Sequence, residues 1–481
     1  MKKMTTIIAL VCVAVCVLGW ITFATDEITA IGQQKDLIEQ ADAWMEAGLY
    51  QRAIKNYQEA RVSADSLELC EKIQKAYALR YDEAKDDTYD LYVEAMEEIV
   101  TIYPGEEIFA LSLANLYIED EEDTSAYTCL KKAVSNGAES DEINKLLEKT
   151  RYSYFMSLSY YNGVKAFSGN AYVVSREGRW GVLDTENGLT LMCDYEFVSQ
   201  VNEEGVLLFT DNKDSRLIDA EGMVLGIFKE KITEAGIFSE GLIAASSGAK
   251  FSYYDEFAQV KFGGYESAGA FVGGRAAVCK DGKWFLIDQN GKAVSEKFAR
   301  IVLNEKGEYL VGDKMLAAKT EGKYAIYDKD LKEIATLDCQ DVDILTPDGL
   351  IAICKNNKWG FVNTAGEVVI QPTYENARSF YNGFAAVCKE GTWGFINTAN
   401  KLVIPYEFTD VTYFDNAGTC MVRVDKPEKE VVEDDDTTHQ DATVETVPAE
   451  GDLSGETEFN EEVIYKEEWQ ILNLYNGITE E

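Results

Sequence analysis

Histidine and carboxylate side chains are the groups from which catalytic chemistry would be built, and this chain supplies them unevenly. Among 481 residues there is one histidine, His439, so a histidine-based triad or a multi-histidine metal site cannot be assembled. The sequence shows no glycine-rich phosphate loop and no Ser-containing nucleophile elbow. The 85 acidic residues could supply an acid–base pair, but no spacing identifies one. We therefore predict no catalytic, cofactor-binding or metal-binding residues, and a protein that is not an enzyme.

The ten cysteines suggest packing rather than redox chemistry, because none forms a C-x-x-C pair. Cys279, Cys354 and Cys388 share the context Ala-Val/Ile-Cys-Lys, which places them at equivalent positions of separate repeats. Equivalent positions lie one repeat apart, which is usually too far for a disulfide. We predict that these cysteines are small buried hydrophobic residues.

The charge of the chain limits its partners. Its 85 acidic residues outnumber its 45 basic residues, for a formal net charge of -40. Non-specific binding to nucleic acid needs a cationic surface, and adsorption to anionic lipid needs basic clusters. We therefore expect no nucleic-acid partner, and membrane association through the N-terminal segment only.

Eight related strings recur in the second half of the chain, each ending in Asp or Asn. That closing residue recurs at steps of 35, 36, 33, 40, 35 and 34 residues, followed by one step of 76. Five strings begin with tryptophan: Trp180–Asp184, Trp284–Asp288, Trp359–Asn363, Trp393–Asn397 and Trp469–Asn473. Three are degenerate: Ser215–Asp219, Phe251–Asp255 and Tyr324–Asp328. The regular steps predict an array of small, similar structural units.

One unit illustrates the expected structure. The pattern predicts a strand at Phe384–Lys389 and a returning strand at Trp393–Asn397. Between them, Glu390-Gly391 predicts a two-residue turn, because these residues accept positive φ. The closing Asp or Asn can accept a backbone N–H and open a second turn before a further strand. An isolated meander cannot bury both of its faces, so neighbouring units must stack. We predict that each tryptophan packs between adjacent sheets and that the following glycine permits a close backbone approach.

These units resemble the WG-repeat (KWG) family, which is named for its Trp-Gly dipeptide. The copy Lys389–Asn397, followed by Leu402–Pro405, matches the pattern almost in full, and the resemblance covers about residues 163–477. Some copies depart from it: Ser215 replaces the aromatic residue, and Phe285 and Gln470 replace the glycine. Those units are expected to be irregular. The resemblance implies a bacterial repeat protein and offers no shared catalytic residues.

Two architectures fit the repeat domain, which we place at residues 159–477. A β-propeller of seven or eight blades closes the array into a ring. An open β-repeat array would leave edges that need protection. The hairpin-rich pattern favours the propeller, within a multidomain α+β chain.

Residues 28–158 show helical spacing and resemble tetratricopeptide (TPR) repeats. Leu37, Ala41 and Trp44 would line one helix, and Gly48 would turn the chain into the next. Two looser copies follow, and residues 141–150 could supply a closing helix. We predict a TPR-like α-solenoid, with a plain stack of helical hairpins as the alternative. Either array is typical of protein or peptide binding.

The N-terminus and an acidic insertion complete the domain organisation. Lys2 and Lys3 precede an uncharged run to Thr25, so residues 1–27 predict a single-pass membrane anchor with the body extracytoplasmic. The alternative is a signal peptide cleaved after Ala24, which would make the protein secreted.

Residues 425–462 hold fifteen acidic residues and two lysines, which predicts a solvated insertion within the last repeat.

We therefore expect a non-enzymatic, membrane-anchored, extracytoplasmic scaffold for protein–protein interactions. One alternative is a module that binds cell-wall carbohydrate, with rings available to stack on sugars. Another is an envelope hydrolase or lyase built on a propeller. The candidate sugar-stacking rings are Tyr160, Tyr161, Tyr413 and Phe414.

Overall fold

A computed structural model describes residues 31–185, 187–427 and 465–478, which fall into two compact units. The first unit ends at Ser153 and the second begins at Tyr154. The sequence placed this boundary between residues 158 and 159. The true boundary is earlier because a strand that directly follows the last helix belongs to the second unit.

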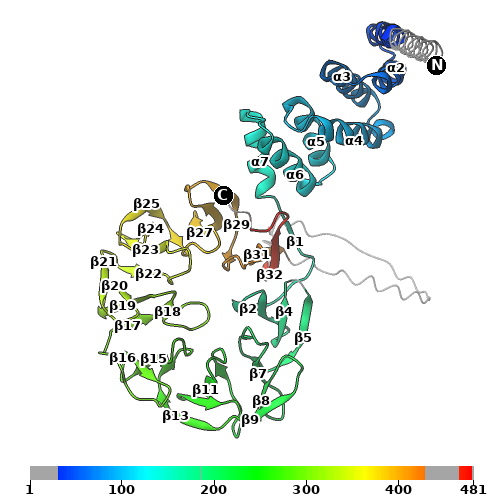
Figure 1. The fold of residues 1–481 in the computed structure, drawn as a ribbon. Coiled ribbons are helices and arrows are strands. Elements are labelled where there is room, and N and C mark those ends of the chain that lie inside the picture. Colours follow the sequence, from blue (N-terminus) through cyan, green and yellow to red (C-terminus); the bar gives the residue numbers. More distant parts are fainter. Residues whose placement is uncertain (1–30, 186, 428–464, 479–481) are drawn as a thin grey trace, which may run out of the picture. The chain divides into compact units, whose positions relative to one another are not determined.

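The first unit is built from helices that pack in sequence order (Figure 1). Helix α2 to helix α7 each contact the next, and α3 also contacts α5. The predicted closing helix is confirmed as α7. Residues 31–46 are helical, and they are followed by α2 (Tyr50–Ser63), α3 (Leu67–Glu83), α4 (Lys85–Ile102), α5 (Glu107–Glu119), α6 (Asp123–Ser135) and α7 (Asp141–Arg151).

Small residues that recur at nearly one repeat length allow these helices to approach closely. Ala41, Ala76 and Ala110 lie 35 and then 34 residues apart, and all three are fully buried. The predicted positions Leu37, Ala41 and Trp44 lie in the helical core, together with Ala53, Tyr57 and Ala60 of the next helix. The unit is thus a helical array with a repeating core, while its assignment as TPR stays a prediction.

The predicted anchor or signal segment, residues 1–27, lies outside the residues that the structure describes. Among the described helices, none combines the length and the apolar character that crossing a membrane requires. The role of residues 1–27 therefore remains a prediction.

The second unit is a β-propeller of eight blades arranged around a centre (Figure 1). In blades 1 to 4, 6 and 7, strands that are consecutive in the chain are neighbours in an antiparallel sheet, and most first strands of the eight blades are only two residues long. Blades 1 to 3 are β2 (Gly163–Ser168), β3 (Ala171–Arg176), β4 (Arg179–Asp184) and β5 (Gly188–Tyr195); β6 (Phe197–Val198), β7 (Leu207–Thr210), β8 (Ser215–Ile218) and β9 (Val224–Ile227); and β10 (Glu234–Ala235), β11 (Leu242–Ser246), β12 (Phe251–Asp255) and β13 (Val260–Tyr265).

Blades 4 to 7 continue this order with two departures. Blade 4 has three strands in its sheet, and blade 5 has an extra short strand, β18. The strands are β14 (Ser267–Ala268), β15 (Arg275–Lys280) and β16 (Lys283–Asp288); β17 (Arg300–Val302), β18 (Leu310–Val311), β19 (Lys314–Thr320), β20 (Lys323–Asp328) and β21 (Glu333–Leu337); β22 (Asp341–Val342), β23 (Ile351–Lys355), β24 (Lys358–Val362) and β25 (Val368–Tyr374); and β26 (Asn376–Ala377), β27 (Phe384–Lys389), β28 (Thr392–Asn397) and β29 (Leu402–Phe408).

Blade 8 closes the ring, because its strands come from both ends of the unit. Its fourth strand is β1, in which Phe155 lies opposite Asn473. This pairing joins the start of the propeller to its end and leaves no unpaired blade edge at the junction. The predicted propeller is confirmed with eight blades, and the open array is wrong. The strands of blade 8 are β30 (Asp410–Val411), β31 (Thr419–Pro427), β32 (Tyr465–Leu474) and β1 (Tyr154–Met156).

The first three residues of the predicted acidic insertion, 425–427, belong to the propeller. Asp425 and Pro427 belong to β31 and pair with Glu467 and Tyr465 in β32. Residues 428–464 lie outside the described residues. In the chain they come between the second and third strands of blade 8, which confirms that the chain returns after them to complete the last blade.

The repeated tryptophans pack between neighbouring blades, as predicted. Trp180 contacts a cluster that includes Val173 of blade 1 and Phe209 of blade 2. Trp393 is 9% exposed, and the other four repeat tryptophans are half-buried. Burial of these large rings contributes part of the apolar area that holds successive blades together.

A cysteine lies directly opposite the tryptophan in three blades. The cross-strand pairs are Cys279 with Trp284, Cys354 with Trp359 and Cys388 with Trp393. Cys279 and Cys388 are buried and Cys354 is half-buried, and the described cysteines are all free thiols. The predicted role as small packing residues is confirmed for Cys279 and Cys388.

The glycine after the tryptophan makes room for the fourth strand. A Cβ at Gly394 would lie 2.7 Å from the carbonyl oxygen of Ile404 and 2.8 Å from that of Pro405. Such contacts are too close, so a side chain here would force the fourth strand away. In blade 4, Phe285 holds this position, and isolated bridges replace a regular fourth strand. The predicted irregularity of that blade is confirmed, whereas blade 2, with Ser215, and blade 8, with Gln470, each form four strands.

Candidate binding surface

The loops between the first and second strands of blades 2 to 8 lie on one face of the propeller, which we call the loop face. Because the strands of a blade are antiparallel, the turns between second and third strands lie on the opposite face. Glu390 and Gly391 form such a turn with φ of 54° and 79°, as predicted. The loops of the loop face are residues 199–206, 236–241, 269–274, 303–313, 343–350, 378–383 and 412–418.

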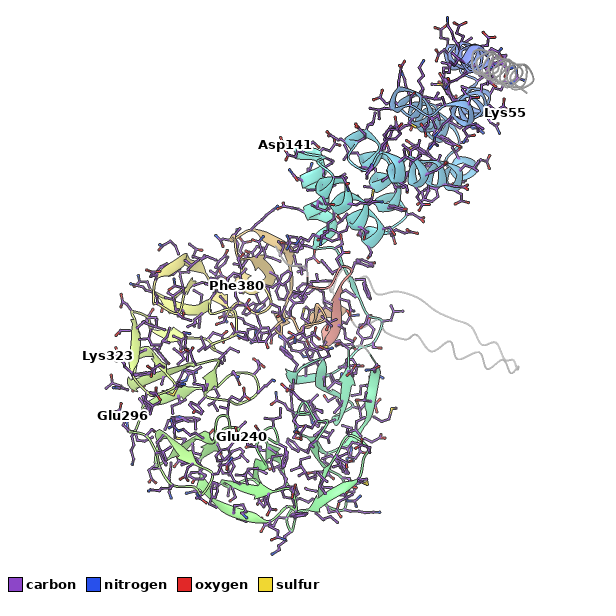
Figure 2. All side chains as sticks on the ribbon, viewed as in Figure 1. Lys55, Asp141, Glu240, Glu296, Lys323 and Phe380 are labelled. Carbon is purple, nitrogen blue, oxygen red and sulfur yellow. The ribbon has the colours of Figure 1, made fainter. Side chains whose placement is uncertain are left out.

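Side chains of these loops lie near the middle of the ring. Figure 2 shows Glu240 at the inner side of its blade, while Glu296 and Lys323 lie at the outer edge. Glu240 belongs to the loop of blade 3 and is exposed. The inner part of the loop face is thus the place where side chains from different blades meet.

Hydrogen bonds between neighbouring blades join the loops into a continuous surface. Ser239 Oγ donates to the carbonyl of Phe271 at 2.7 Å, and Asn382 Nδ2 donates to the carbonyl of Phe414 at 3.1 Å. These bonds hold the loops of neighbouring blades in fixed relative positions. Similar bonds join Asn202 to Phe238, Gly274 to Glu240, and Gly383 to Asp348.

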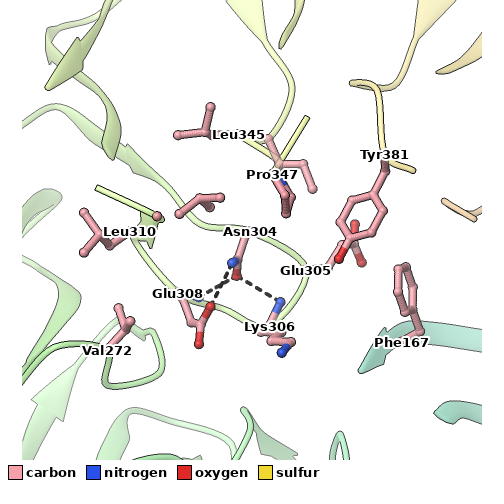
Figure 3. Close-up of a pocket in the computed structure, with 13 residues that line it drawn as sticks. Phe167, Val272, Asn304, Glu305, Lys306, Glu308, Leu310, Leu345, Pro347 and Tyr381 are labelled. Atoms are coloured by element: carbon pink, nitrogen blue, oxygen red, sulfur yellow. Dashed lines mark hydrogen bonds between the residues drawn. The ribbon is translucent and has the colours of Figure 1, made fainter. Parts of the chain in front are cut away.

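The loop of blade 5 is the longest, and its tip forms a tight turn (Figure 3). Asn304 Oδ1 accepts hydrogen bonds from the backbone N–H of Lys306 at 3.0 Å and of Glu308 at 2.8 Å. Gly307, with φ of 75°, completes the turn. The turn therefore has a defined shape that presents Glu305 and Lys306 at its tip.

Blades 2 and 4 hold this tip in place. Gln200 Nε2 donates to the carbonyl of Glu305 at 2.7 Å, and Lys306 Nζ pairs with Glu203 at 2.9 Å. On the other side, the N–H of Ala270 donates to the carbonyl of Gly307 at 2.8 Å. The loop of blade 5 is therefore anchored both to blade 4, which precedes it in the chain, and to blade 2, which is not its neighbour in the chain.

Two cavities adjoin the tip. The first has a volume of about 280 Å³ and combines an apolar wall with Glu305 and Glu308. The second, of about 310 Å³, shares Lys306 and Glu308 with the first and adds three further glutamates. Carboxylates thus dominate the charged groups around the tip. The apolar wall of the first cavity includes Phe167, Val272, Leu310, Ile344, Leu345 and Tyr381, and the added glutamates are Glu203, Glu204 and Glu240.

Glu305 has an unusual environment for a carboxylate. Burial, with a smaller contribution from nearby Asp343, raises the pKa of Glu305 to about 7, although Arg378 acts in the opposite direction. Within the described residues, its carboxylate accepts no hydrogen bond from the protein. A half-buried carboxylate that accepts no hydrogen bond is destabilised in its charged form, which raises its pKa.

The basic group that acts on the pKa of Glu305, Arg378, already has partners. Its guanidinium donates to Asp410 at 3.1 Å and lies 5.6 Å from the ring centre of Trp393, although its buried Nε has no hydrogen-bond partner among the described residues. Asp343 in turn accepts hydrogen bonds from the N–H of Ser379 at 2.6 Å and from the hydroxyl of Tyr413. Burial and Asp343 raise the pKa of the Tyr413 hydroxyl well above its usual value.

The rings proposed for sugar stacking are mostly inaccessible. Tyr161, Tyr413 and Phe414 are 3%, 4% and 1% exposed. Tyr160 is half-buried. The aromatic segment between repeats, which recurs from unit to unit, therefore packs the core, and Tyr161, Tyr413 and Phe414 are too buried to stack on a sugar.

The sequence prediction named no site residue and missed the tip of blade 5. One signal was present: the step from Asp288 to Asp328 is 40 residues, while the neighbouring steps are 33 and 35. The additional residues lie in the loop 303–313, which reaches the centre. Among the described residues, no group of three or more His, Cys, Asp or Glu side chains could hold a metal ion.

The helical unit has a separate cavity of about 420 Å³ formed by α2, α3 and α4. Charged side chains of both signs line it, together with Tyr77 and Leu91. The acidic residues are Asp87, Glu94 and Glu98, and the basic residues are Lys55 and Arg80.

A family model described as the WG containing repeat matches the chain at three places: residues 253–284, 359–393 and 393–426. Each match starts in or near the third strand of one blade and runs into the next blade. The sequence repeat is therefore offset from the structural blade, so each copy spans an interface between blades. No curated protein matches the chain in sequence.

Several solved structures are similar to the chain at low identity. BamB from Moraxella catarrhalis is 12% identical, with a TM-score of 0.39, and the match covers 56% of this chain and 97% of that one. Hsv2 from Kluyveromyces lactis is 9% identical, with a TM-score of 0.33 and coverage of 58% and 95%. The Dos1 propeller is 10% identical, with a TM-score of 0.34 and coverage of 54% and 92%.

Proposed function

We propose that this chain, a WG-repeat protein, is a non-enzymatic interaction scaffold that presents the loop face of its propeller to a protein partner. The strongest support is that hydrogen bonds join loops from different blades into one surface around the tip of blade 5. Such a surface is preorganised, which lowers the entropic cost of binding another protein. The helical unit would offer a second binding region.

We further propose that the protein acts outside the cytoplasm. Lys2, Lys3 and the uncharged run that follows them support a single-pass anchor with the body extracytoplasmic. Cleavage after Ala24 would release the same body as a secreted protein. Neither alternative alters the proposed role of the loop face.

Site-specific photo-cross-linking in the native host tests the proposed binding face. A cross-linking amino acid at Glu204 or Glu240, both exposed on the loop face, is expected to capture one defined protein. The same amino acid at Glu177 or Glu321, both exposed in turns of the opposite face, is the matched control. Capture from the control positions alone, or yields no higher than from an anchor without the propeller, would contradict the proposal.

One observation favours a second candidate, an envelope hydrolase or lyase. A carboxyl whose pKa lies at about 7, as for Glu305, is suited to donate and accept protons at neutral pH. The other nearby carboxylates are less suited to act as the second catalytic acid or base, because each already accepts hydrogen bonds. Asp343 accepts them from Tyr413 and Ser379, and Glu308 accepts one from Asn304. Turnover of cell-wall glycan by the purified protein, abolished in Glu305→Gln, would establish the enzyme. The carbohydrate-binding alternative has lost the buried rings on which it depended.

A further inference from the structure

Among the residues that the structure describes, no basic side chain forms an ion pair with Glu305. Two basic side chains lie near it on the loop face, and both are engaged elsewhere: Lys306 pairs with Glu203, and Arg378 donates to Asp410. Glu305 itself lines the cavity of about 280 Å³, and Figure 3 shows it on the side of the loop that faces Tyr381 and Phe167. An unpaired carboxylate in such a cavity is stabilised when a cation enters.

The apolar wall of the same cavity selects among cations. Phe167 and Leu345 are buried at 5% and 4% exposure, and they close the cavity behind the carboxylate together with Ile344 and Tyr381. A small hydrated metal ion gains nothing from such a wall. The long aliphatic stem of lysine or arginine packs on apolar and aromatic surfaces while its charged end reaches a carboxylate.

The wider charge distribution favours the same kind of partner. Glu203, Glu204, Glu240 and Glu308 surround the tip, and one of them is neutralised by Lys306. The chain as a whole has a net charge of -40. A basic protein segment is therefore attracted over long range and finds several carboxylates at the centre of the loop face.

We infer that the cavity beside the blade 5 tip receives a lysine or arginine side chain from a basic segment of the partner protein. Glu305 pairs with the cationic end, and an apolar neighbour in the same segment packs against Phe167 and Tyr381. This inference rests on the proposed function, because it names the chemistry of the partner at the same face.

The raised pKa of Glu305 gives the interaction a pH dependence. The charged groups that act on Glu305 are Arg378, which favours its ionisation, and Asp343, which opposes it, while Tyr381 and Tyr413, whose own pKa values are raised, lie nearby as neutral groups. Below a pH of about 7 the free protein holds Glu305 protonated, so a bound cation must displace a proton. Binding is therefore expected to be tighter at pH 8 than at pH 6.

Fluorescence anisotropy with the full-length chain in detergent tests the inference. The probe is a fluorescein-labelled peptide of alternating leucine and lysine, and the matched probe has glutamate in place of lysine. The lysine peptide is expected to bind, with affinity that falls as salt rises. Glu305→Gln is expected to weaken binding at least about tenfold, and to remove most of the pH dependence.

Glu321→Gln is the control variant, because Glu321 is an exposed glutamate of the same blade on the opposite face. It is expected to change binding by less than about twofold, since a distant exposed charge is screened. Equal binding of the two peptides, or equal loss in both variants, would overturn the inference. If the peptide fails while Glu204 and Glu240 still cross-link a partner, the inference is wrong and the proposed function stands. If those cross-links also fail, the proposed function is wrong.

Discussion

Blades 4 and 7 have the same tryptophan but differ in the residue that follows it. In blade 7, Gly394 lets strand β29 approach and form a ladder with β28. In blade 4, Phe285 replaces the glycine, and isolated bridges from Trp284 and Ile287 remain. The Phe285 ring packs instead on a cluster shared with blade 3.

The comparison shows that the two residues of the dipeptide have separate roles. Tryptophan is at least half-buried in both cases, and Trp284 contacts a cluster that includes residues of blade 5 even though no glycine follows it. Glycine makes room for the fourth strand in blade 7, although blades with Ser252, Ala325 or Gln470 at this position also pair a fourth strand. Blade 4 retains its place in the ring because packing between blades persists when the ladder of the fourth strand is lost.

The largest expected effect comes from filling the space at Gly394. Gly394→Ala is expected to lower the free energy of unfolding by about 3 kcal/mol, because the new Cβ meets the backbone of β29. Urea unfolding followed by tryptophan fluorescence measures the loss. Gly236→Ala is the control, since a Cβ there meets no atom within 4 Å, and it should be nearly neutral. Equal losses in both variants would show that close approach of β29 is not the reason for the glycine.

The reciprocal change in blade 4 should not stabilise the protein. Phe285→Gly is expected to cost about 2 kcal/mol, because a half-buried ring is removed from the cluster shared with blade 3. The same unfolding assay applies. A gain in stability would mean that blade 4 can form a fourth strand once the side chain is absent, and that packing with blade 3 matters little.

The turn that follows the third strand, and that leads to the place of the fourth strand, is present in blade 4 as well as in blade 6. Asp288 Oδ1 accepts backbone N–H groups of Asn290 and Lys292, both at 2.9 Å, and Asn363 Oδ1 accepts two at 3.0 Å. Asp288→Ala and Asn363→Ala are therefore expected to cost a similar amount, about 1 kcal/mol each. A loss confined to Asn363→Ala would mean that the turn of blade 4 depends on the missing ladder.

The smallest expected effect concerns the other irregular unit, blade 5. The pKa of Glu305 is raised in the folded protein to about 7, above the usual value of about 4.3 in an unfolded chain. The folded state then holds an extra proton between these values, so this residue lowers stability as pH rises through that window. Since Glu305 is partly exposed, the effect should be below about 1 kcal/mol after solvent screening.

Thermal unfolding at two pH values measures this contribution. Glu305→Gln is expected to raise the unfolding midpoint relative to the unmodified chain at pH 8, and to leave it nearly unchanged at pH 4.5. The reverse pattern would mean that the carboxylate is stabilised when charged, and would remove the need for a cation from a partner.

Much of the fold could be predicted because the sequence repeats. The eight strings, the tight turns such as Glu390-Gly391 and the packing of Trp393 all follow from local pattern. The sequence could not reveal β1, since Tyr154–Met156 resembles no repeat and pairs with residues more than 300 positions away. Nor could it reveal the environment of Glu305, which depends on Arg378 and Asp343 from other blades.

The role of the loop face is tested most directly by hydrogen exchange of the full-length chain, alone and with the partner captured by cross-linking. We expect slower exchange in residues 199–206, 236–241 and 303–313 of the complex, and unchanged exchange in the turns at residues 177–178 and 321–322. Protection confined to those turns, or to residues 31–151 of the helical unit, would contradict the account.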